Sequence, residues 1–413
     1  MSDAGERQSP RKGAIVLGGA HGSLEIARSL GRRGIPVWFI TADNPLAGLS
    51  RFVERSLRWR GPRDDGALSF LTDLARRHGL AGWVLFAGGD DDVWFVAQNH
   101  AALGALFTLT TPAWDTIRWK HDKRAMNARA AQLGIAHPLT RQARSRDELA
   151  SLGMTFPLIL KPAMHEGRNA FVDAKAWRAN DEAALLTRYE AAKALVGADT
   201  IMIQELIPGD GTTQFSYAAL WDRGKPVASL VTQRRRQYPV EFGFTSTLVE
   251  TIEQPQIKAE ACRLLASLDY SGLVEVEFKY DARDCRYKIL DVNARAWSWL
   301  SLGRAAGIDF AGLQWCAASG EAIAPQAPRR SVRWLYASRD FAALLPDMLH
   351  GSLPPTAYLR SFRRPLALAV FAWDDPVPAL LDLPLSAVRV AARWLARRKT
   401  AAAPHLQSAK LPT

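Results

Sequence analysis

The chain has 413 residues, of which 48% are hydrophobic and 23% are charged, so it is long enough to bury two or three globular domains. Three widely spaced cysteines, Cys262, Cys285 and Cys316, argue against a disulfide framework or a zinc site and favour a reducing compartment. Residues 1–12 are polar, lack the apolar core of a signal peptide and are expected to form a disordered leader. No apolar run approaches the roughly 20 residues of a membrane-spanning helix. We therefore expect a cytoplasmic protein.

The net charge of +12 is compatible with an anionic substrate, an anionic membrane surface or nucleic acid. Arginine is spread along the chain, and no basic motif is flanked by aromatic residues, so no nucleic-acid partner is expected. The C-terminal stretch 387–399 could place apolar residues on one helix face and arginines on the other. That pattern fits either peripheral contact with an anionic membrane or a helix packed on the protein.

The first part of the chain alternates strands and helices. Strands are expected at 13–19, 36–41 and 82–92, the last with a polar exit, and helices at 23–34, 67–79 and 111–135. Strand, glycine turn, helix and strand make a βαβ unit, so residues 13–111 should form a Rossmann-like domain with a parallel sheet.

The glycine turn of this unit contains Gly18, Gly19 and Gly22, with a candidate ribose acid at Asp43. Its spacing is wrong for a dinucleotide fingerprint. The turn would more naturally hold part of a carboxylate substrate at a helix N-terminus.

From residue 155 the texture changes to α+β with mostly antiparallel strands. Strands are expected at 155–162 and 200–209, helices at 181–195 and 255–270, and hairpins at 213–222/225–238 and 272–281/285–295. We place one domain at 112–327, with a lid at about 150–210, and a basic C-terminal extension at 328–413.

The second hairpin carries the most informative polar pattern. Glu275 and Glu277 share one strand face, and Asp291, Asn293 and Arg295 share one face of the next. Facing side chains on paired strands lie about 4.5–5.5 Å apart, which would form a hard-oxygen cluster suited to Mg²⁺. The alternative is a solvated polar face with ion pairs, for example between Glu275 and Lys288.

Further charged residues precede this hairpin. Lys161 ends an apolar strand, where an ammonium either reaches solvent or meets an anion. Gln204, Glu205 and Asp210 surround a Pro-Gly turn whose strand could present its backbone to an adenine edge, with an acid for ribose hydroxyls. Lys123 supplies another basic group.

Lysine, strand-turn edge, glutamate and D-x-N-x-R occur here in an order that resembles the ATP-grasp superfamily over roughly residues 13–325. The resemblance implies a two-subdomain ATP-grasp fold after the Rossmann-like domain, binding ATP and Mg²⁺ (or Mn²⁺). It assigns ATP contacts to Lys123, Lys161, Gln204, Glu205, Leu206, Ile207 and Asp210, and metal ligation to Glu277, Asp291 and Asn293. Asp291 stands where the family usually has glutamate.

One segment departs from the family pattern. The lid loop, 163–175, normally rich in glycine and serine, has the single glycine Gly167, so Arg168 is expected to replace part of its phosphate contacts.

A second segment resembles the carboxylate–amine ligase-like members of the superfamily. Residues 232–247 carry this resemblance, which places Arg235, Arg236 and Glu241 near the acceptor pocket. Arg236 and Arg295 are the candidate catalytic residues. The implied function is an ATP-dependent ligase that activates a small-molecule carboxylate as an acyl phosphate for attack by an amine. The alternative is a non-catalytic nucleotide-binding regulator; a homodimer is left open.

Overall fold

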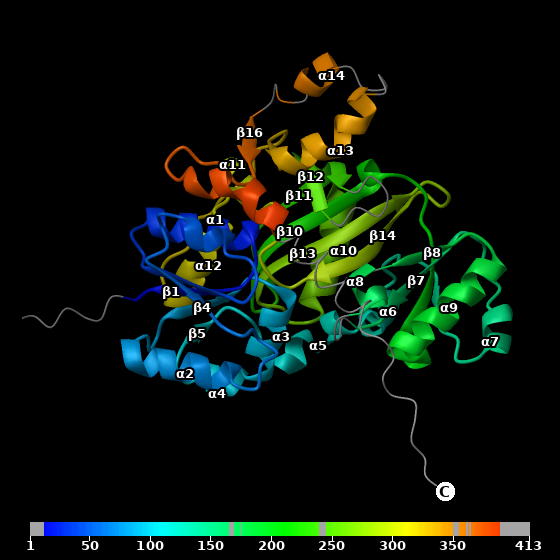
Figure 1. Cartoon of the computed structure of the whole chain (residues 1–413), viewed down its shortest axis with the longest axis horizontal. Coiled ribbons are helices and arrows are strands. Elements are labelled where there is room, and N and C mark those ends of the chain that lie inside the picture. Colours follow the sequence, from blue (N-terminus) through cyan, green and yellow to red (C-terminus); the bar gives the residue numbers. More distant parts are fainter. Residues whose placement is uncertain are drawn as a thin grey trace, which may run out of the picture.

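The computed structural model describes residues 12–164, 169–174, 176–238, 245–349, 355–360, 362 and 365–388. Within these residues the strands form three sheets, here called the N-terminal, lid and central sheets (Figure 1). The central sheet lies between the N-terminal domain, in blue, and the lid, in green. This arrangement confirms the mixed α/β and α+β class.

The N-terminal sheet is parallel, with the order β3-β2-β1-β4-β5. Its strands β1, β2 and β4 are fully buried, as expected for short apolar runs covered on both faces. The strands are β1 (Ala14–Leu17), β2 (Val37–Thr41), β3 (Arg55–Arg58), β4 (Val84–Ala87) and β5 (Thr108–Leu109). The helical segments are α1 (His21–Arg32), η1 (Leu46–Leu49), α2 (Ala67–His78), α3 (Asp90–Gln98) and α4 (His100–Gly104). The sheet confirms the Rossmann-like prediction.

Two predicted elements differ in detail. The polar exit expected after β4 is the first turn of α3, where three aspartates face the positive end of the helix. The single helix expected at 111–135 is two helices, α5 (Trp114–His121) and α6 (Lys123–Gln132). The chain breaks at Asp122, whose side chain caps α6 by accepting from the Arg124 amide, and whose backbone forms a bridge with Met164. This break brings Lys123 to the start of α6.

The lid sheet has the order β6-β9-β7-β8 and packs against α9. Its elements are β6 (Thr140–Arg141), α7 (Arg146–Ala150), β7 (Leu158–Pro162), α8 (Ala170–Ala174), β8 (Trp177–Ala179), α9 (Glu182–Val196), η2 (Ala198–Thr200) and β9 (Ile201–Glu205). A separate apolar cluster holds this unit together, with Phe171 and Tyr189 among its fully buried members.

The central sheet has the order β14-β13-β10-β11-β12-β15-β16. Helix α10 contacts β10 and β11, while α12 contacts β10, β13 and the N-terminal domain. Its elements are η3 (Gly211–Thr213), β10 (Gln214–Asp222), β11 (Lys225–Tyr238), β12 (Thr245–Ile252), α10 (Pro255–Ala266), β13 (Gly272–Asp281), β14 (Arg286–Asn293), α11 (Leu300–Ala305), α12 (Phe310–Ser319), β15 (Arg333–Leu335) and β16 (Leu366–Leu368). Both expected hairpins are present.

The C-terminal extension is built into this fold. After the expected boundary at 327, β15 pairs with β12 and β16 pairs with β15, so the extension completes the central sheet. It continues in α13 (Ala337–Leu349), α14 (Pro355–Arg360) and a helical stretch, 377–388. No helix among the described residues is long and apolar enough to cross a membrane.

Candidate active site

The acidic face of the second hairpin forms as the sequence predicts. In the β13–β14 ladder Glu275 lies opposite Asn293 and Glu277 lies opposite Asp291. Because both pairs belong to one unbroken stretch of register, which shifts only after Glu277, the four side chains gather on one face of the sheet.

Glu275 anchors this face from within. Its Oε1 accepts hydrogen bonds from Ser216 Oγ at 3.0 Å and Trp299 Nε1 at 3.1 Å. Asn293 Nδ2 donates to Glu275 Oε2 at 3.2 Å and to Glu277 Oε1 at 2.9 Å. Burial, with the nearby Glu277 charge, raises the pKa of Glu275 to about 7.

The ion pair considered between Glu275 and Lys288 does not form. Lys288 Nζ instead lies 2.9 Å from Glu205 Oε1 and 2.7 Å from Asp281 Oδ2. The hairpin is therefore not a solvated face held by that pair.

Two lysines from separate elements face the acidic cluster. Lys123 Nζ lies 2.7 Å from Asp291 Oδ2, and the Lys123 amide donates to the carbonyl of Ala163 just beyond β7. Burial opposes the charge on Asp291, but the Lys123 ammonium outweighs it and keeps the pKa of Asp291 below its ordinary value. Lys161, on β7, donates to Gln204 Oε1 at 3.0 Å. Burial, with the neighbouring Lys123 charge, lowers the pKa of Lys161 to about 8.

Two arginines close the other side of the cluster. Arg234 Nη2, on β11, lies 3.5 Å from Glu277 Oε2. Arg295 Nη2 lies 3.0 Å from Asp90 Oδ2 at the start of α3, and Asp90 also pairs with Lys120. The Nε of Arg295 is buried and has no hydrogen-bond partner among the described residues. The candidate catalytic arginine is thus held by the N-terminal domain.

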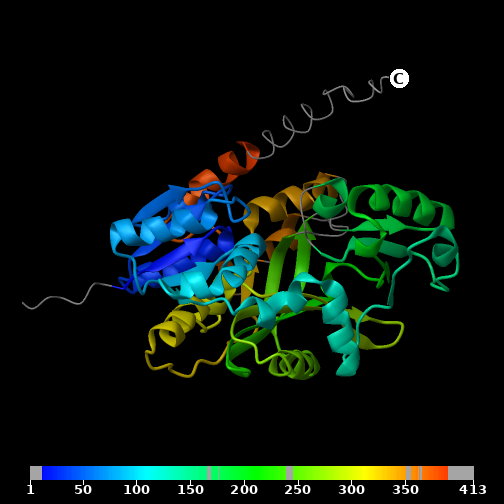
Figure 2. The same cartoon turned by 90° about the horizontal axis from the view of Figure 1, so that it is seen from below.

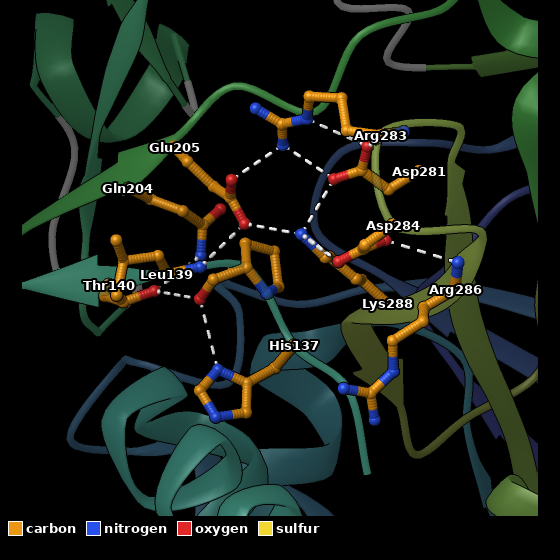
Figure 3. Close-up of polar contacts among 11 residues, drawn as sticks. His137, Leu139, Thr140, Gln204, Glu205, Asp281, Arg283, Asp284, Arg286 and Lys288 are labelled. Atoms are coloured by element: carbon orange, nitrogen blue, oxygen red, sulfur yellow. Dashed lines mark hydrogen bonds and ion pairs between the residues drawn. The ribbon is translucent and has the colours of Figure 1, made fainter. Parts of the chain in front are cut away.

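The residues of β9 that were predicted to contact adenine, Gln204 and Glu205, have different surroundings. Gln204 is buried, with Nε2 donating to Thr140 Oγ1 at 3.0 Å while its Oε1 faces Lys161. Glu205 instead joins a network with Lys288 and Arg283, and Figure 3 shows its carboxylate between these two cations. Burial opposes the charge on Glu205, but the hydrogen bond from Lys288 outweighs the effect of burial and lowers the pKa of Glu205. Glu205 therefore ties the lid to the β13–β14 hairpin.

The remaining residues that were predicted to contact ATP, Leu206, Ile207 and Asp210, follow the end of β9. The Leu206 amide donates to the carbonyl of Pro157 at 3.2 Å, and Ile207 is buried. Asp210 caps η3 and accepts from the amide of Thr212 at 2.8 Å. The hydroxyl of Thr212, and after it this amide, lower the pKa of Asp210.

The three arginines of β11 each pair with an acidic residue of a neighbouring element. Arg235 Nε lies 3.0 Å from Glu250 Oε2, in a pocket of about 570 Å³ bordered by β12 and β15. Arg236 makes two hydrogen bonds, of 2.9 and 2.7 Å, to Asp340 on α13. Arg234, which was not singled out, is the arginine that reaches the acidic cluster. Glu241 lies outside the described residues, as do Gly167 and Arg168 of the lid loop.

The glycine turn of the N-terminal domain lies against the side chain of Asp92. Gly18 has a φ of +57°, and a Cβ there would lie 2.1 Å from Asp92 Oδ2. Burial, with the nearby Asp91, raises the pKa of Asp92 to about 7. The turn therefore packs on a buried carboxyl group of the domain itself.

The donor set suits a hard divalent cation shared with phosphate. No group of three His, Cys, Asp or Glu side chains with metal-ligand geometry occurs among the described residues. Mg²⁺ is usually held by one or two carboxylates with waters and substrate phosphates, so Glu277 and Asp291 suffice. The Nδ2 of Asn293 is used by the glutamates, which leaves its oxygen as the atom able to ligate.

Comparison with known proteins gives one family match and several shared folds. Residues 122–325 match the family model described as carbamoyl-phosphate synthase L chain, ATP binding domain. No curated protein sequence matches the chain.

Several solved structures share the fold over most of their length. An L-amino acid ligase from Bacillus licheniformis is 18% identical, with a TM-score of 0.59, over 79% of this chain and 80% of that one. N5-carboxyaminoimidazole ribonucleotide synthetase from Thermus thermophilus is 20% identical, with a TM-score of 0.60, over 78% and 82%. The biotin carboxylase domain of Hydrogenobacter thermophilus 2-oxoglutarate carboxylase, a dimer in complex with MgADP, ADP and bicarbonate, is 14% identical, with a TM-score of 0.61, over 79% and 74%.

The matching family model and the shared fold identify an ATP-grasp protein. Within that superfamily, residues 122–325 resemble the ATP-binding domain of the carbamoyl-phosphate synthase large chain.

Proposed function

We propose that the protein is an ATP-dependent ligase that activates a small-molecule carboxylate as an acyl phosphate. The observation that supports this most is the acidic face Glu277–Asp291–Asn293 opposite Lys123 and Lys161. Carboxylates for a metal and ammonium groups for phosphate oxygens meet there, as phosphoryl transfer requires.

In this proposal Lys123 and Lys161 bind phosphate oxygens of ATP, with adenine along Gln204, Leu206 and Ile207. Glu277, Asp291 and Asn293 would hold Mg²⁺ or Mn²⁺, which when bound neutralises charge that develops on the phosphate oxygens. Lys123 also pairs with Asp291, so a phosphate bound by this lysine would compete with that carboxylate.

The proposed reaction needs only ATP, the carboxylate and the amine, and each bond that forms is matched by one that breaks. A carboxylate oxygen attacks the γ-phosphorus, ADP leaves, and an acyl phosphate forms. An amine then attacks the carbonyl carbon, phosphate leaves, and the amine loses a proton. The planar fork of Arg295 would steady the transferring phosphoryl group, with its position set by Asp90.

The test is ADP release with Mg²⁺ and pooled carboxylates, with and without pooled amines such as amino acids. A ligase releases ADP faster when both pools are present, and Asn293→Ala serves as the inactive control. ATP binding without stimulated ADP release from any pool would instead favour the nucleotide-binding regulator.

A further inference from the structure

The final helical stretch of the described chain, 377–388, buries an acidic side chain and exposes large apolar ones. Its Asp382 is buried and accepts from Tyr336 Oη at 3.2 Å and Ser338 Oγ at 3.3 Å. Large apolar side chains face outward instead. They are Val377, Leu380, Leu381, Leu383 and Val388, preceded by Trp373, which is 90% exposed. We call these six residues the apolar patch.

The patch is a concentrated feature of this surface. It holds six of the thirteen large apolar side chains that are exposed in the described part of the chain. Leu380 and Leu383 are 74% and 62% exposed. Exposed apolar side chains that gather on one segment are typical of surfaces that contact a partner or a membrane.

The patch is fixed to the body of the protein at its start. Asp375 accepts from Arg28 Nε at 2.9 Å and Ser50 Oγ at 2.7 Å, and both side chains of the Arg28–Asp375 pair are buried. Asp374 receives two hydrogen bonds from Arg32. Figure 2 shows the helical stretch, in red, beyond the N-terminal domain at the outer surface. The helical stretch therefore starts from a point that is fixed to the N-terminal domain.

The charge of the adjoining sequence indicates what covers the patch. Residues 383–413 contain six basic and no acidic residues, half of the net charge of +12: Arg389, Arg393, Arg397, Arg398, Lys399 and Lys410. A second copy of the chain would bring the same positive charge. An anionic bilayer offers both an apolar layer and opposite charge.

We propose that the apolar patch docks on the surface of an anionic lipid bilayer. Trp373 suits the headgroup region because an indole combines an apolar ring with a polar N–H. The leucines enter the boundary of the acyl chains, and the basic sequence that follows contributes attraction that salt screens. The inference is independent of the ligase proposal.

The experiment is co-sedimentation of the full chain with vesicles of phosphatidylcholine alone or mixed with phosphatidylserine. The test variant is L380S/L383S, and the matched control is L195S/I323S, which changes two exposed apolar residues away from the patch. Solvent-facing positions keep the fold, which the melting temperature verifies.

We expect the wild type and the control to bind mixed vesicles, and the test variant to bind at least about tenfold more weakly. Raising the salt concentration should weaken wild-type binding. Equal binding of both variants, or equal binding to both vesicle types, would overturn the proposal. So would a dimer that the test variant splits with no change in sedimentation, since the patch would then join two copies.

Discussion

Lys161 is a lysine of the proposed ATP site whose charge changes with pH not far above neutrality. Burial and Lys123 lower its pKa to about 8, so the ammonium is mostly present at pH 7 and mostly lost at pH 9. In the proposed site it binds a phosphate. Lys161→Ala should weaken ATP binding by about ten- to a hundredfold at pH 7, since a charge-assisted hydrogen bond contributes roughly 1.5–3 kcal/mol.

The pH dependence of ATP binding tests this assignment further. Bound phosphate favours the charged lysine, so the pKa of Lys161 rises in the complex. The Kd for ATP should therefore increase as pH rises above about 8, by at most about tenfold per pH unit. Lys161→Arg keeps its charge throughout and should flatten this increase. Parallel Kd curves for the two proteins, measured by calorimetry, would contradict the assignment.

Arg295 tests how the N-terminal domain takes part in the proposed chemistry. Its guanidinium is held by Asp90, while its Nε has no partner among the described residues. Because it would meet charge that is greatest in the transition state, Arg295→Ala should lower kcat more than ATP affinity, by about a hundredfold against a few-fold. Arg295→Lys lacks the planar fork and should fail nearly as badly.

The contact with Asp90 supplies the control for Arg295. Asp90→Asn keeps a hydrogen-bond acceptor but removes the charge, so it should reduce kcat less than Arg295→Ala. If the Arg295 variants chiefly lower the melting temperature and keep normal kcat in the folded fraction, the residue has a structural role.

At the scale of elements, the β13–β14 hairpin concentrates the proposed metal ligands. Glu277→Gln and Asn293→Ala should reduce ADP release at least about a hundredfold with smaller effects on ATP binding, because the metal acts chiefly on developing charge. Arg286→Gln, an exposed site on the same strand, is the matched control. Near-normal turnover in either test variant would show that the acidic face is not the metal site.

The sequence predicted this hairpin because its signal is local. Alternation along a strand determines which residues share a face, so Glu277, Asp291 and Asn293 could be grouped without knowledge of the fold. The partners of the cluster could not, because Arg234 and Asp90 arrive from strands and helices distant in sequence. Arg234 was hidden in a run of three arginines whose two bulged pairings obscure the alternation.

The predicted boundaries of elements were wrong where a helix cap, and not the apolar periodicity, determines where a helix begins. The apolar spacing over 111–135 continues through Asp122, but its carboxylate caps α6 and ends the continuous helix. Likewise, the three aspartates after β4 were expected to be the polar exit of the strand, but they form the first turn of α3, where acidic residues are favoured. A local reading that weighed caps equally would have placed Lys123 at a helix start.

At the scale of the whole molecule, the C-terminal extension links the central sheet to the N-terminal domain, and we call this link the clamp. Strands β15 and β16 extend the central sheet, and the next segment returns to α1 of the N-terminal domain. The Arg236–Asp340 pair adds a contact between β11 and α13. The extension was expected to be a basic tail, because its short strands carry little apolar alternation.

This clamp predicts a stability difference between two neighbouring arginines of α1. Arg28 and Asp375 are 3% and 1% exposed, and Arg28 also donates to the carbonyls of Val370 and Asp375. Removing one member leaves the other charge buried without its partner, so Arg28→Met should lower the free energy of unfolding by about 3–5 kcal/mol. Arg32→Gln removes the more exposed pair with Asp374 and should cost only about 0–1 kcal/mol. Urea unfolding of both variants measures the difference, and the double variant R28M/D375N separates a buried unpaired charge from lost packing. If Arg28→Met and Arg32→Gln are equally stable, the return of the chain to α1 does not hold the two domains together.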